Sequence, residues 1–265
     1  MQYFIPVIIV VAIGLLSGAI LTIAAKVMAV KVDETVIKLT EALPGANCGA
    51  CGFAGCADYA AALAEDSTIA TNHCTPGGNA VAKAISEILG VEFAEASSKT
   101  AIVKCSGSSD KTSYAMDYQG HQTCAANKLF YKGRGLCEKA CLGFGDCVNA
   151  CDYGAIRIEN GLAVVNRNKC LGCGACAKAC PNQLIEVVPA KTRVVVGCSS
   201  VDSGAVTRQV CNIGCIGCKI CEKECKFDAI HVIDNHAVID YTKCKNCTLC
   251  AKVCPRKVIH VLPKK

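Results

Sequence analysis

Cysteine constrains this chain more than any other residue type, because 24 of its 265 positions are Cys. The chain has no Trp and only 5% aromatic residues, so it has few large side chains with which to build a packed core. Small cysteine-dense modules fold around disulfides or bound metal. We therefore expect several short modules, held together by sulfur chemistry, rather than one large domain.

The N-terminal segment indicates the compartment in which these thiols lie. Positions 1–25 carry no charge and consist mainly of Ile, Val, Leu, Ala and Gly, and a helix of that length crosses a bilayer. Lys26 and Lys31 follow the apolar segment and no basic residue precedes it, so the positive-inside rule places the C-terminal bulk in the cytoplasm. Cytoplasmic thiols stay reduced, which favours metal over disulfides. A cleaved signal peptide is the alternative, but the segment lacks a basic start and is too long for one.

The first cysteine group follows Leu43-Pro44-Gly45 with the spacing C-x2-C-x4-C-x17-C. Small residues separate the first three thiols, so the backbone can wrap closely around an inorganic core, and helices are expected over 58–65 and 79–89. Four thiolates bind one [4Fe-4S] cluster, and a tetrahedral zinc ion is the alternative. His73 is not expected to bind metal, because four thiols already complete the site. The ligands predicted here are Cys48, Cys51, Cys56 and Cys74.

The second half of the chain contains an internal repeat. When Cys147 is laid on Cys221, the register holds without a gap to Pro189 on Pro263. Each unit ends in C-x2-C-x2-C-x3-C-P, the pattern of two-cluster ferredoxins, in which the fourth Cys binds the other cluster. Short hairpins are expected between the cysteine runs, over 156–164 and 230–238. Three ligand sets follow: Cys151, Cys170, Cys173 and Cys176; Cys215, Cys218, Cys221 and Cys254; and Cys225, Cys244, Cys247 and Cys250.

The first unit departs from the pattern at one position, because Phe144 stands where the repeat predicts the counterpart of Cys218. Cys137 can supply the missing thiolate, so the fifth set is predicted to be Cys137, Cys141, Cys147 and Cys180. The cysteines that then remain are Cys105, Cys124, Cys198 and Cys211. They form a sixth site, or they are buried thiols that behave as small hydrophobic side chains. The expected cofactors are thus five or six [4Fe-4S] clusters.

These patterns predict an α+β chain with an N-terminal transmembrane helix, a small helical [4Fe-4S] domain and two tandem ferredoxin-like dicluster modules. The expected boundaries are a membrane anchor at 1–31, the N-terminal cluster domain at 32–95, a connector at 96–136, the first module at 137–190, a second connector at 191–210 and the second module at 211–265.

The formal charge of +6 does not indicate a nucleic-acid-binding protein. Four thiolates on an oxidised cluster leave about −2 per site, so five clusters bring the total to about −4 and six to about −6. An acidic partner would still need a local basic patch. The candidates lie around the last cysteine run, where ordinary solvated charge is the alternative: Lys243, Lys245, Lys252, Arg256, Lys257, Lys264 and Lys265.

Four features together resemble the B subunit of the Rnf complex: the apolar start, the Leu-Pro-Gly-x-Asn-Cys segment at 43–56, the Cys-Leu-Gly-x-Gly-Asp-Cys block at 141–147 and the tandem ferredoxin runs. The resemblance implies a subunit of a membrane ferredoxin:NAD oxidoreductase that couples electron transfer to Na⁺ or H⁺ translocation. It also implies that the chain takes electrons from soluble ferredoxin and passes them to membrane-bound and flavin-bearing subunits.

The residues indicate electron transfer without substrate catalysis by this chain alone. No nucleotide-binding glycine fingerprint, Walker A sequence or flavin-attachment sequence is present, so NAD and flavin chemistry is assigned to partner subunits. Two alternatives remain open. A membrane-anchored polyferredoxin of a hydrogenase or another anaerobic reductase would use the same chemistry, and a structural zinc-ribbon protein would have no redox role.

Overall fold

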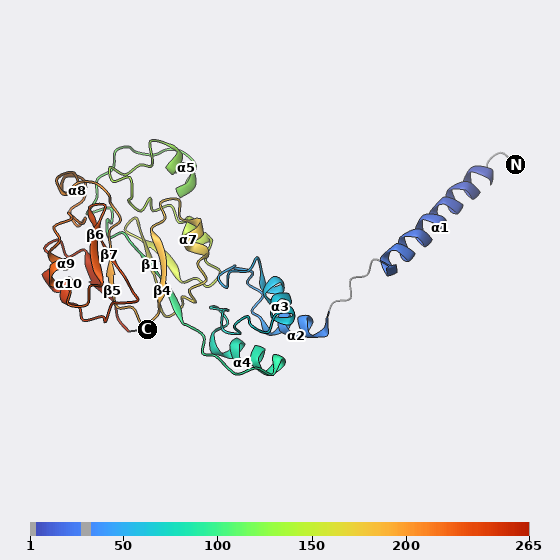
Figure 1. Ribbon diagram of the computed structural model, residues 1–265. Helices are drawn as coiled ribbons and strands as arrows, with labels where there is room; N and C mark the ends of the chain where they lie inside the picture. Colours follow the sequence, from blue (N-terminus) through green and yellow to red (C-terminus); the bar gives the residue numbers. More distant parts are fainter. Residues whose placement is uncertain (1–3, 28–32, 265) are drawn as a thin grey trace.

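The computed structural model describes residues 4–27 and 33–264. Helix α1 (Phe4–Val27) stands apart from the rest of the molecule (Figure 1). Among the described residues, no helix combines the length and the apolar character needed to cross a membrane. The expected anchor at 1–31, part of which lies outside the described residues, stays a prediction.

The N-terminal cluster domain is helical, as expected. Its three helices are α2 (Glu34–Ala42), α3 (Cys56–Glu65) and α4 (Gly78–Leu89). Their apolar faces enclose a core whose largest members, Leu39, Tyr59, Leu63 and Ile85, are at most 2% exposed. The Tyr59 hydroxyl is buried with them and donates a 2.7 Å hydrogen bond to the Ala70 carbonyl. Side chains from all three helices thus form a core separate from those of the ferredoxin modules.

The first ferredoxin module contains two antiparallel strand pairs and two short helices. The hairpin β2 (Ile156–Glu159) and β3 (Leu162–Val165) lies inside the repeat unit, and β1 (Lys99–Val103) pairs with β4 (Ile185–Pro189). Helices α6 (Asp146–Asn149) and α7 (Ala175–Ala179) carry cysteines of the two runs. Helix α5 (Cys124–Leu129) precedes the module in sequence.

The second module repeats this arrangement. Strands β6 (Ile230–Ile233) and β7 (His236–Ile239) form its hairpin, and β5 (Val194–Val196) pairs with β8 (Ile259–Val261). Its short helices are α9 (Ile220–Glu224) and α10 (Leu249–Val253), and α8 (Gly204–Val210) precedes them. Both expected hairpins are therefore confirmed.

The first hairpin turns at the dipeptide that the sequence indicated. Asn160 and Gly161 have φ of 47° and 72°, which is the left-handed pair that a type I′ turn requires. Gly161 can adopt this conformation without strain because it lacks a Cβ atom. In the second hairpin the corresponding positions are Asp234 and Asn235, with φ of 45° and 64°. Asp and Asn are among the residues that tolerate left-handed φ, so the same turn forms without glycine.

The two stretches expected to be connectors are parts of the modules. Residues 96–136 contain β1 and residues 191–210 contain β5, and each strand pairs with the last strand of the nearer module. These strands also bring the modules together. Ile102 of β1, Val188 of β4 and Val195 of β5 form one buried apolar cluster, against which Tyr241 and Leu262 of the second module pack. The two modules therefore share a small core.

Arg167 adds a polar link at the same junction. The residue is 8% exposed, and its guanidinium donates 2.7 Å hydrogen bonds to the carbonyl oxygens of Ala190, Thr192 and Pro263. These three acceptors belong to the segment between the modules and to the C-terminal end of the second module. Arg167 thereby joins the first module to both.

Candidate metal centres

The four cysteines of the N-terminal domain lie close together. Cys56 begins α3, and its backbone N–H donates to the Asn47 side-chain oxygen at 2.8 Å, which fixes the entry of the loop into the helix. Burial raises the pKa of Cys74, and the thiols of Cys56, Cys51 and Cys48 raise it further. His73 stacks its ring on Tyr59, with centroids 6.2 Å apart, an apolar contact that needs no metal.

The second module brings together both of its interlaced quartets. Each quartet lines a hollow, of about 340 Å³ in one case and 350 Å³ in the other. The thiols around the first are Cys215, Cys218, Cys221 and Cys254, and those around the second are Cys225, Cys244, Cys247 and Cys250. Burial, followed by repulsion from the neighbouring thiolates, raises the pKa of Cys221 to about 12 and that of Cys250 to about 11.

One quartet of the first module gathers the thiols that the ferredoxin pattern groups together. Burial raises the pKa of Cys176 to about 11, and the thiols of Cys170, Cys173 and Cys151 contribute to the shift. Cys170 accepts hydrogen bonds from the backbone N–H groups of Ala101 (3.3 Å) and Gly172 (3.4 Å). Since such donors stabilise the charged form of sulfur, the surroundings of Cys170 are suited to a metal-bound thiolate.

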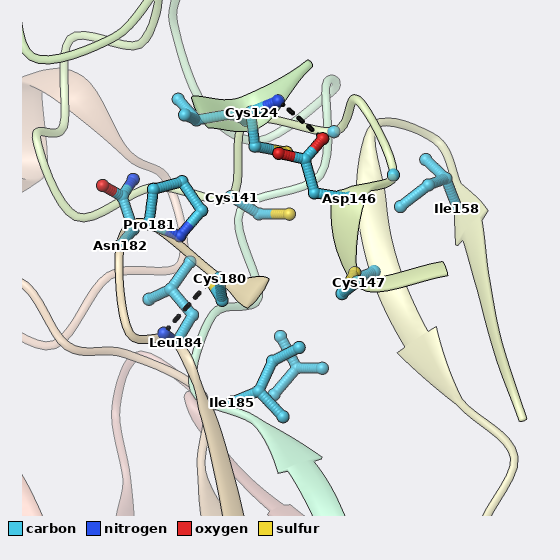
Figure 2. Close-up of a pocket in the computed structure, with 15 residues that line it drawn as sticks. Cys124, Cys141, Asp146, Cys147, Ile158, Cys180, Pro181, Asn182, Leu184 and Ile185 are labelled. Atoms are coloured by element: carbon cyan, nitrogen blue, oxygen red, sulfur yellow. Dashed lines mark hydrogen bonds between the residues drawn. The ribbon is translucent and has the colours of Figure 1, made fainter. Parts of the chain in front are cut away.

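The remaining quartet of the first module differs from the expectation. The hollow there, of about 390 Å³, is lined by Cys124, Cys141, Cys147 and Cys180, and Cys137 is not among its residues (Figure 2). Burial raises the pKa of Cys147 to about 12, and the next contributions come from Cys141 and Cys124. Cys124, rather than Cys137, therefore stands where Phe144 interrupts the repeat.

Asp146 explains why Cys124 reaches this position. Its carboxylate accepts hydrogen bonds from the backbone N–H groups of Cys124 (2.8 Å) and Ala125 (2.9 Å), at the first turn of α5. Thr123 caps the same helix by accepting from Ala126 N–H at 3.2 Å. The sequence shows that Phe144 stands where the repeat predicts a cysteine. It does not show that Cys124 replaces that cysteine, because Cys124 lies well upstream of Cys141 and belongs to no spaced run.

Cys137 instead belongs to a fourth hollow of the ferredoxin region, of about 380 Å³. The other cysteines around it are Cys105, Cys198 and Cys211. Three of the four thiols left over by the sequence thus come together, and the fourth, Cys124, has exchanged places with Cys137.

The quartets suit iron-sulfur clusters better than single ions. All 24 cysteines lie in the described part of the chain, and none is joined to another by a disulfide. Within residues 4–27 and 33–264, no group of three or more His, Cys, Asp or Glu side chains is arranged to hold a single metal ion. A [4Fe-4S] core takes one thiolate at each of four iron corners, so its ligands stand further apart than those of zinc. The four all-thiol quartets that line hollows in the ferredoxin region match that requirement.

Neighbouring quartets lie next to one another. The thiol of Cys48 contributes to the raised pKa of Cys173, and the Lys178 ammonium donates a 3.0 Å hydrogen bond to the Cys48 carbonyl, so the N-terminal quartet sits against the first module. Within that module, Cys176 is among the groups that raise the pKa of Cys147. The N-terminal quartet and the two quartets of the first module are thus consecutive neighbours.

The basic residues near the last cysteine run have different roles. Arg256 is half-buried and donates to the carbonyls of Cys211 (2.7 Å) and Gly214 (3.2 Å), so it stabilises the interior. Lys243 pairs with Asp228 at 3.0 Å. The exposed candidates in the described residues are Lys243, Lys245, Lys252, Lys257 and Lys264, and Lys265 lies outside them.

Comparison with known families gives three matches. Residues 43–76 match a family described as "Putative Fe-S cluster". Residues 162–185 and 237–260 each match a family described as "4Fe-4S binding domain". Together these three segments contain at least one cysteine of each quartet that was predicted from the spacing of the cysteine runs.

Similar curated proteins cover most of the chain. The B subunit of a "Proton-translocating ferredoxin:NAD(+) oxidoreductase complex" from Clostridium ljungdahlii is 41% identical over 88% of this chain and 82% of its own length. The B subunit of a "Na(+)-translocating ferredoxin:NAD(+) oxidoreductase complex" from Acetobacterium woodii is 41% identical over 91% of this chain and 72% of its own. The B subunit of an "Ion-translocating oxidoreductase complex" from Methanosarcina acetivorans is 40% identical over 88% of both chains.

Proposed function

The chain belongs to the B-subunit family of the Rnf complex, the ion-translocating ferredoxin:NAD(+) oxidoreductase, and we propose that its thiol quartets form the electron path of that subunit. The chain is the electron-transfer subunit of a translocase. This family membership outweighs the alternatives of a hydrogenase polyferredoxin and a zinc-ribbon protein.

Five quartets hold the [4Fe-4S] clusters of the path, and each cluster supplies one-electron transfer when bound. The chain's own contribution is to supply thiolates, limit the access of water to each hollow and donate backbone N–H groups to sulfur. The ligand sets are Cys48, Cys51, Cys56 and Cys74; Cys151, Cys170, Cys173 and Cys176; Cys124, Cys141, Cys147 and Cys180; Cys215, Cys218, Cys221 and Cys254; and Cys225, Cys244, Cys247 and Cys250.

The observation that carries this proposal is the succession of quartets from the N-terminal domain through the first module. Electron tunnelling weakens steeply with distance, so a path needs cofactors in immediate succession. The thiol of Cys48 lies close enough to Cys173 to raise its pKa, which places the N-terminal quartet beside the first module. Cys176 likewise raises the pKa of Cys147, which places the two sites of that module beside each other.

Reduced soluble ferredoxin docks on the second module in this proposal. Cys247 is exposed, unlike most of the cysteines, so the cluster that it holds is accessible from outside. Lys245 lines the same hollow and is exposed beside it, where it attracts an acidic partner. The electrons continue through the chain to membrane-bound and flavin-bearing partner subunits, and ultimately to NAD.

The N-terminal segment anchors the chain to the cytoplasmic membrane as a single pass, with the C-terminal bulk in the cytoplasm. The support for this proposal is the sequence, since positions 1–25 carry no charge and Lys26 and Lys31 follow them. Deleting residues 1–31 should move the chain from the membrane fraction to the soluble fraction. Retention of the deleted chain in membranes stripped of its partner subunits would contradict the anchor.

Stopped-flow mixing of the purified complex with reduced ferredoxin tests the docking site. Lys245→Glu should lower the second-order rate of ferredoxin oxidation severalfold at low salt and flatten its salt dependence. Lys83→Glu is the matched control, because Lys83 is exposed on α4 and far along the chain from the last cysteine run. Equal rates and equal salt slopes for the two variants would place the ferredoxin site elsewhere.

A further inference from the structure

The phenylalanine that interrupts the repeat is part of an aromatic group around Arg134. The guanidinium carbon of Arg134 lies 4.7 Å from the centre of the Tyr114 ring and 4.5 Å from the centre of the Phe144 ring. Tyr118 packs edge-on against Phe144, with ring centroids 5.7 Å apart, and this contact holds the Phe144 ring in place. Phe144 therefore does more than remove a cysteine, because it provides one wall of a site that holds a cation.

Arg134 lies against the loop that carries two thiols of the neighbouring quartet. We call this set of Cys124, Cys141, Cys147 and Cys180 the Cys124 quartet. A Cβ atom at Gly143 would lie 3.2 Å from a terminal nitrogen of the Arg134 guanidinium. Gly143 lines the same hollow as Cys141 and Cys147 (Figure 2), and its backbone hydrogen-bonds the sulfur of Cys141. The cation and a ligand sulfur thus lie next to the same glycine.

The charge of Arg134 has no carboxylate partner within residues 4–27 and 33–264. The ion pairs there all involve other residues. The Nε atom of Arg134 is buried and has no hydrogen-bond partner in the same part of the chain. Aromatic faces reduce the cost of removing a cation from water, but they do not neutralise it. The counter-charge available beside Arg134 is the bound cluster of the Cys124 quartet, at about −2 when oxidised and about −3 when reduced.

The hollow of the Cys124 quartet also contains a negative side chain. Asp146 is the carboxylate that lines it, and this group accepts hydrogen bonds from the first turn of α5. A carboxylate beside a cluster opposes the arrival of an electron, because like charges repel. The Arg134 cation has the opposite effect, and the aromatic rings around it limit screening by water.

The repeat supplies a comparison within the same chain. The register that lays Cys147 on Cys221 also lays Arg134 on Arg208 and Phe144 on Cys218. Arg208 lies on α8 and is exposed. The cation–ring contacts found in the described residues both belong to Arg134. Arg208 is thus an arginine at the equivalent position without the aromatic surroundings, which makes it a matched control.

We propose that Arg134 raises the reduction potential of the cluster held by the Cys124 quartet, by placing an unpaired positive charge beside it. Reduction adds one negative charge to the site, so a cation held out of water favours the reduced state. The electron comes from reduced ferredoxin, which is oxidised by its loss, and no proton or covalent bond is transferred. The inference deepens the proposed function and rests on it, since it requires a cluster in this quartet.

The test is a redox titration of the anaerobically purified complex, monitored by EPR. Cys124→Ala identifies the signal of the Cys124 quartet by removing it. Arg134→Met should make reduction of that signal about tenfold less favourable, which lowers the midpoint by about 59 mV for one electron. Arg134→Lys keeps the charge in a more strongly hydrated form, so the shift should be smaller. Arg208→Met should leave the midpoint unchanged.

Three results would overturn the inference. They are an unchanged midpoint in Arg134→Met, an equal shift in Arg208→Met, and an equal shift in Arg134→Lys, which would assign the effect to lost packing rather than to charge. If the iron content shows that Arg134→Met has lost the cluster, Phe144→Leu decides, because it keeps the charge but opens the guanidinium to water. A lower midpoint in that variant supports the inference, and an unchanged one rejects it.

Failure of the proposed function gives a different result. If Cys124→Ala removes no EPR signal and no iron, the Cys124 quartet holds no cluster, and both the proposed ligand set and the inference are wrong. If Cys124→Ala removes a signal whose midpoint does not respond to Arg134→Met, the inference alone is wrong.

Discussion

Replacing Arg167 by Met tests whether the two modules are held together as the structure indicates. The guanidinium donates three 2.7 Å hydrogen bonds to carbonyls, and at least one of these contacts is buried. A net value of about 1 kcal/mol per hydrogen bond gives a loss of about 3 kcal/mol, since Met keeps most of the apolar stem but leaves three acceptors unpaired. Arg167 is 8% exposed, so Met avoids the cost of burying a charge, and this returns part of the loss and brings the expected net cost to about 2 kcal/mol.

The assay is the half-life of the visible cluster absorbance in guanidinium chloride under anaerobic conditions. A cost of about 2 kcal/mol corresponds to roughly 30-fold faster loss if the junction opens before iron leaves. Arg193→Met is the matched control, because Arg193 lies at the same junction and its side chain makes a single 3.5 Å contact with the Leu262 carbonyl. Half-lives of the Arg167 and Arg193 variants within twofold of each other would refute the reasoning.

Three further predictions concern other parts of the molecule. Gly172→Ala should lower the iron content by about four atoms. The Cβ atom of the new alanine would lie 2.7–2.8 Å from atoms of Lys99 in β1, and the backbone at this position has a φ of +70°. Retention of the full iron content would contradict this prediction. Tyr59→Phe should cost about 1 kcal/mol at pH 8 through the lost hydrogen bond. That cost should shrink between pH about 10 and 12, because burial raises the pKa of Tyr59 to about 12. In this pH range the phenol ionises in the unfolded chain before it ionises in the folded one, so the stability of the wild type falls. Anaerobic urea midpoints of both proteins at pH 8 and pH 11 check the two statements, and a difference that does not depend on pH would count against them. Lys178→Met should slow electron equilibration between the N-terminal cluster and the first module, measured by freeze-quench EPR after ferredoxin mixing, whereas an unchanged rate would show that the Cys48 contact does not hold the domain.

The sequence was sufficient to predict which thiols lie together wherever they come from closely spaced runs. The repeat predicted both hairpins, and the ferredoxin pattern predicted that Cys254 would join Cys215 from the far end of the module, because interlacing is a property of the duplicated unit. The helices α3 and α4 of the N-terminal domain begin within two positions of the starts that the sequence predicted.

The exchange of Cys124 and Cys137 could not be predicted in the same way. Cys124 reaches its hollow through the Asp146 carboxylate, a contact between residues that are 22 positions apart and carry no spacing signal. The strands in the two stretches taken as connectors were also missed, because β1 and β5 are short and acquire their structure by pairing with β4 and β8. One signal was available: Val-x-Cys-Ser occurs at 103–106 and again at 196–199, and marks the thiols that follow these strands.

The central claim is that the thiols act in quartets around iron-sulfur cores. An anomalous difference map, recorded at the iron absorption edge on crystals of the anaerobically purified chain, tests it most directly. We predict one compact, multi-atom iron peak between the sulfurs of every quartet, including one with Cys124 and not Cys137 beside Cys141. Single-atom peaks, peaks at the zinc edge or continuous density between paired sulfurs would contradict it.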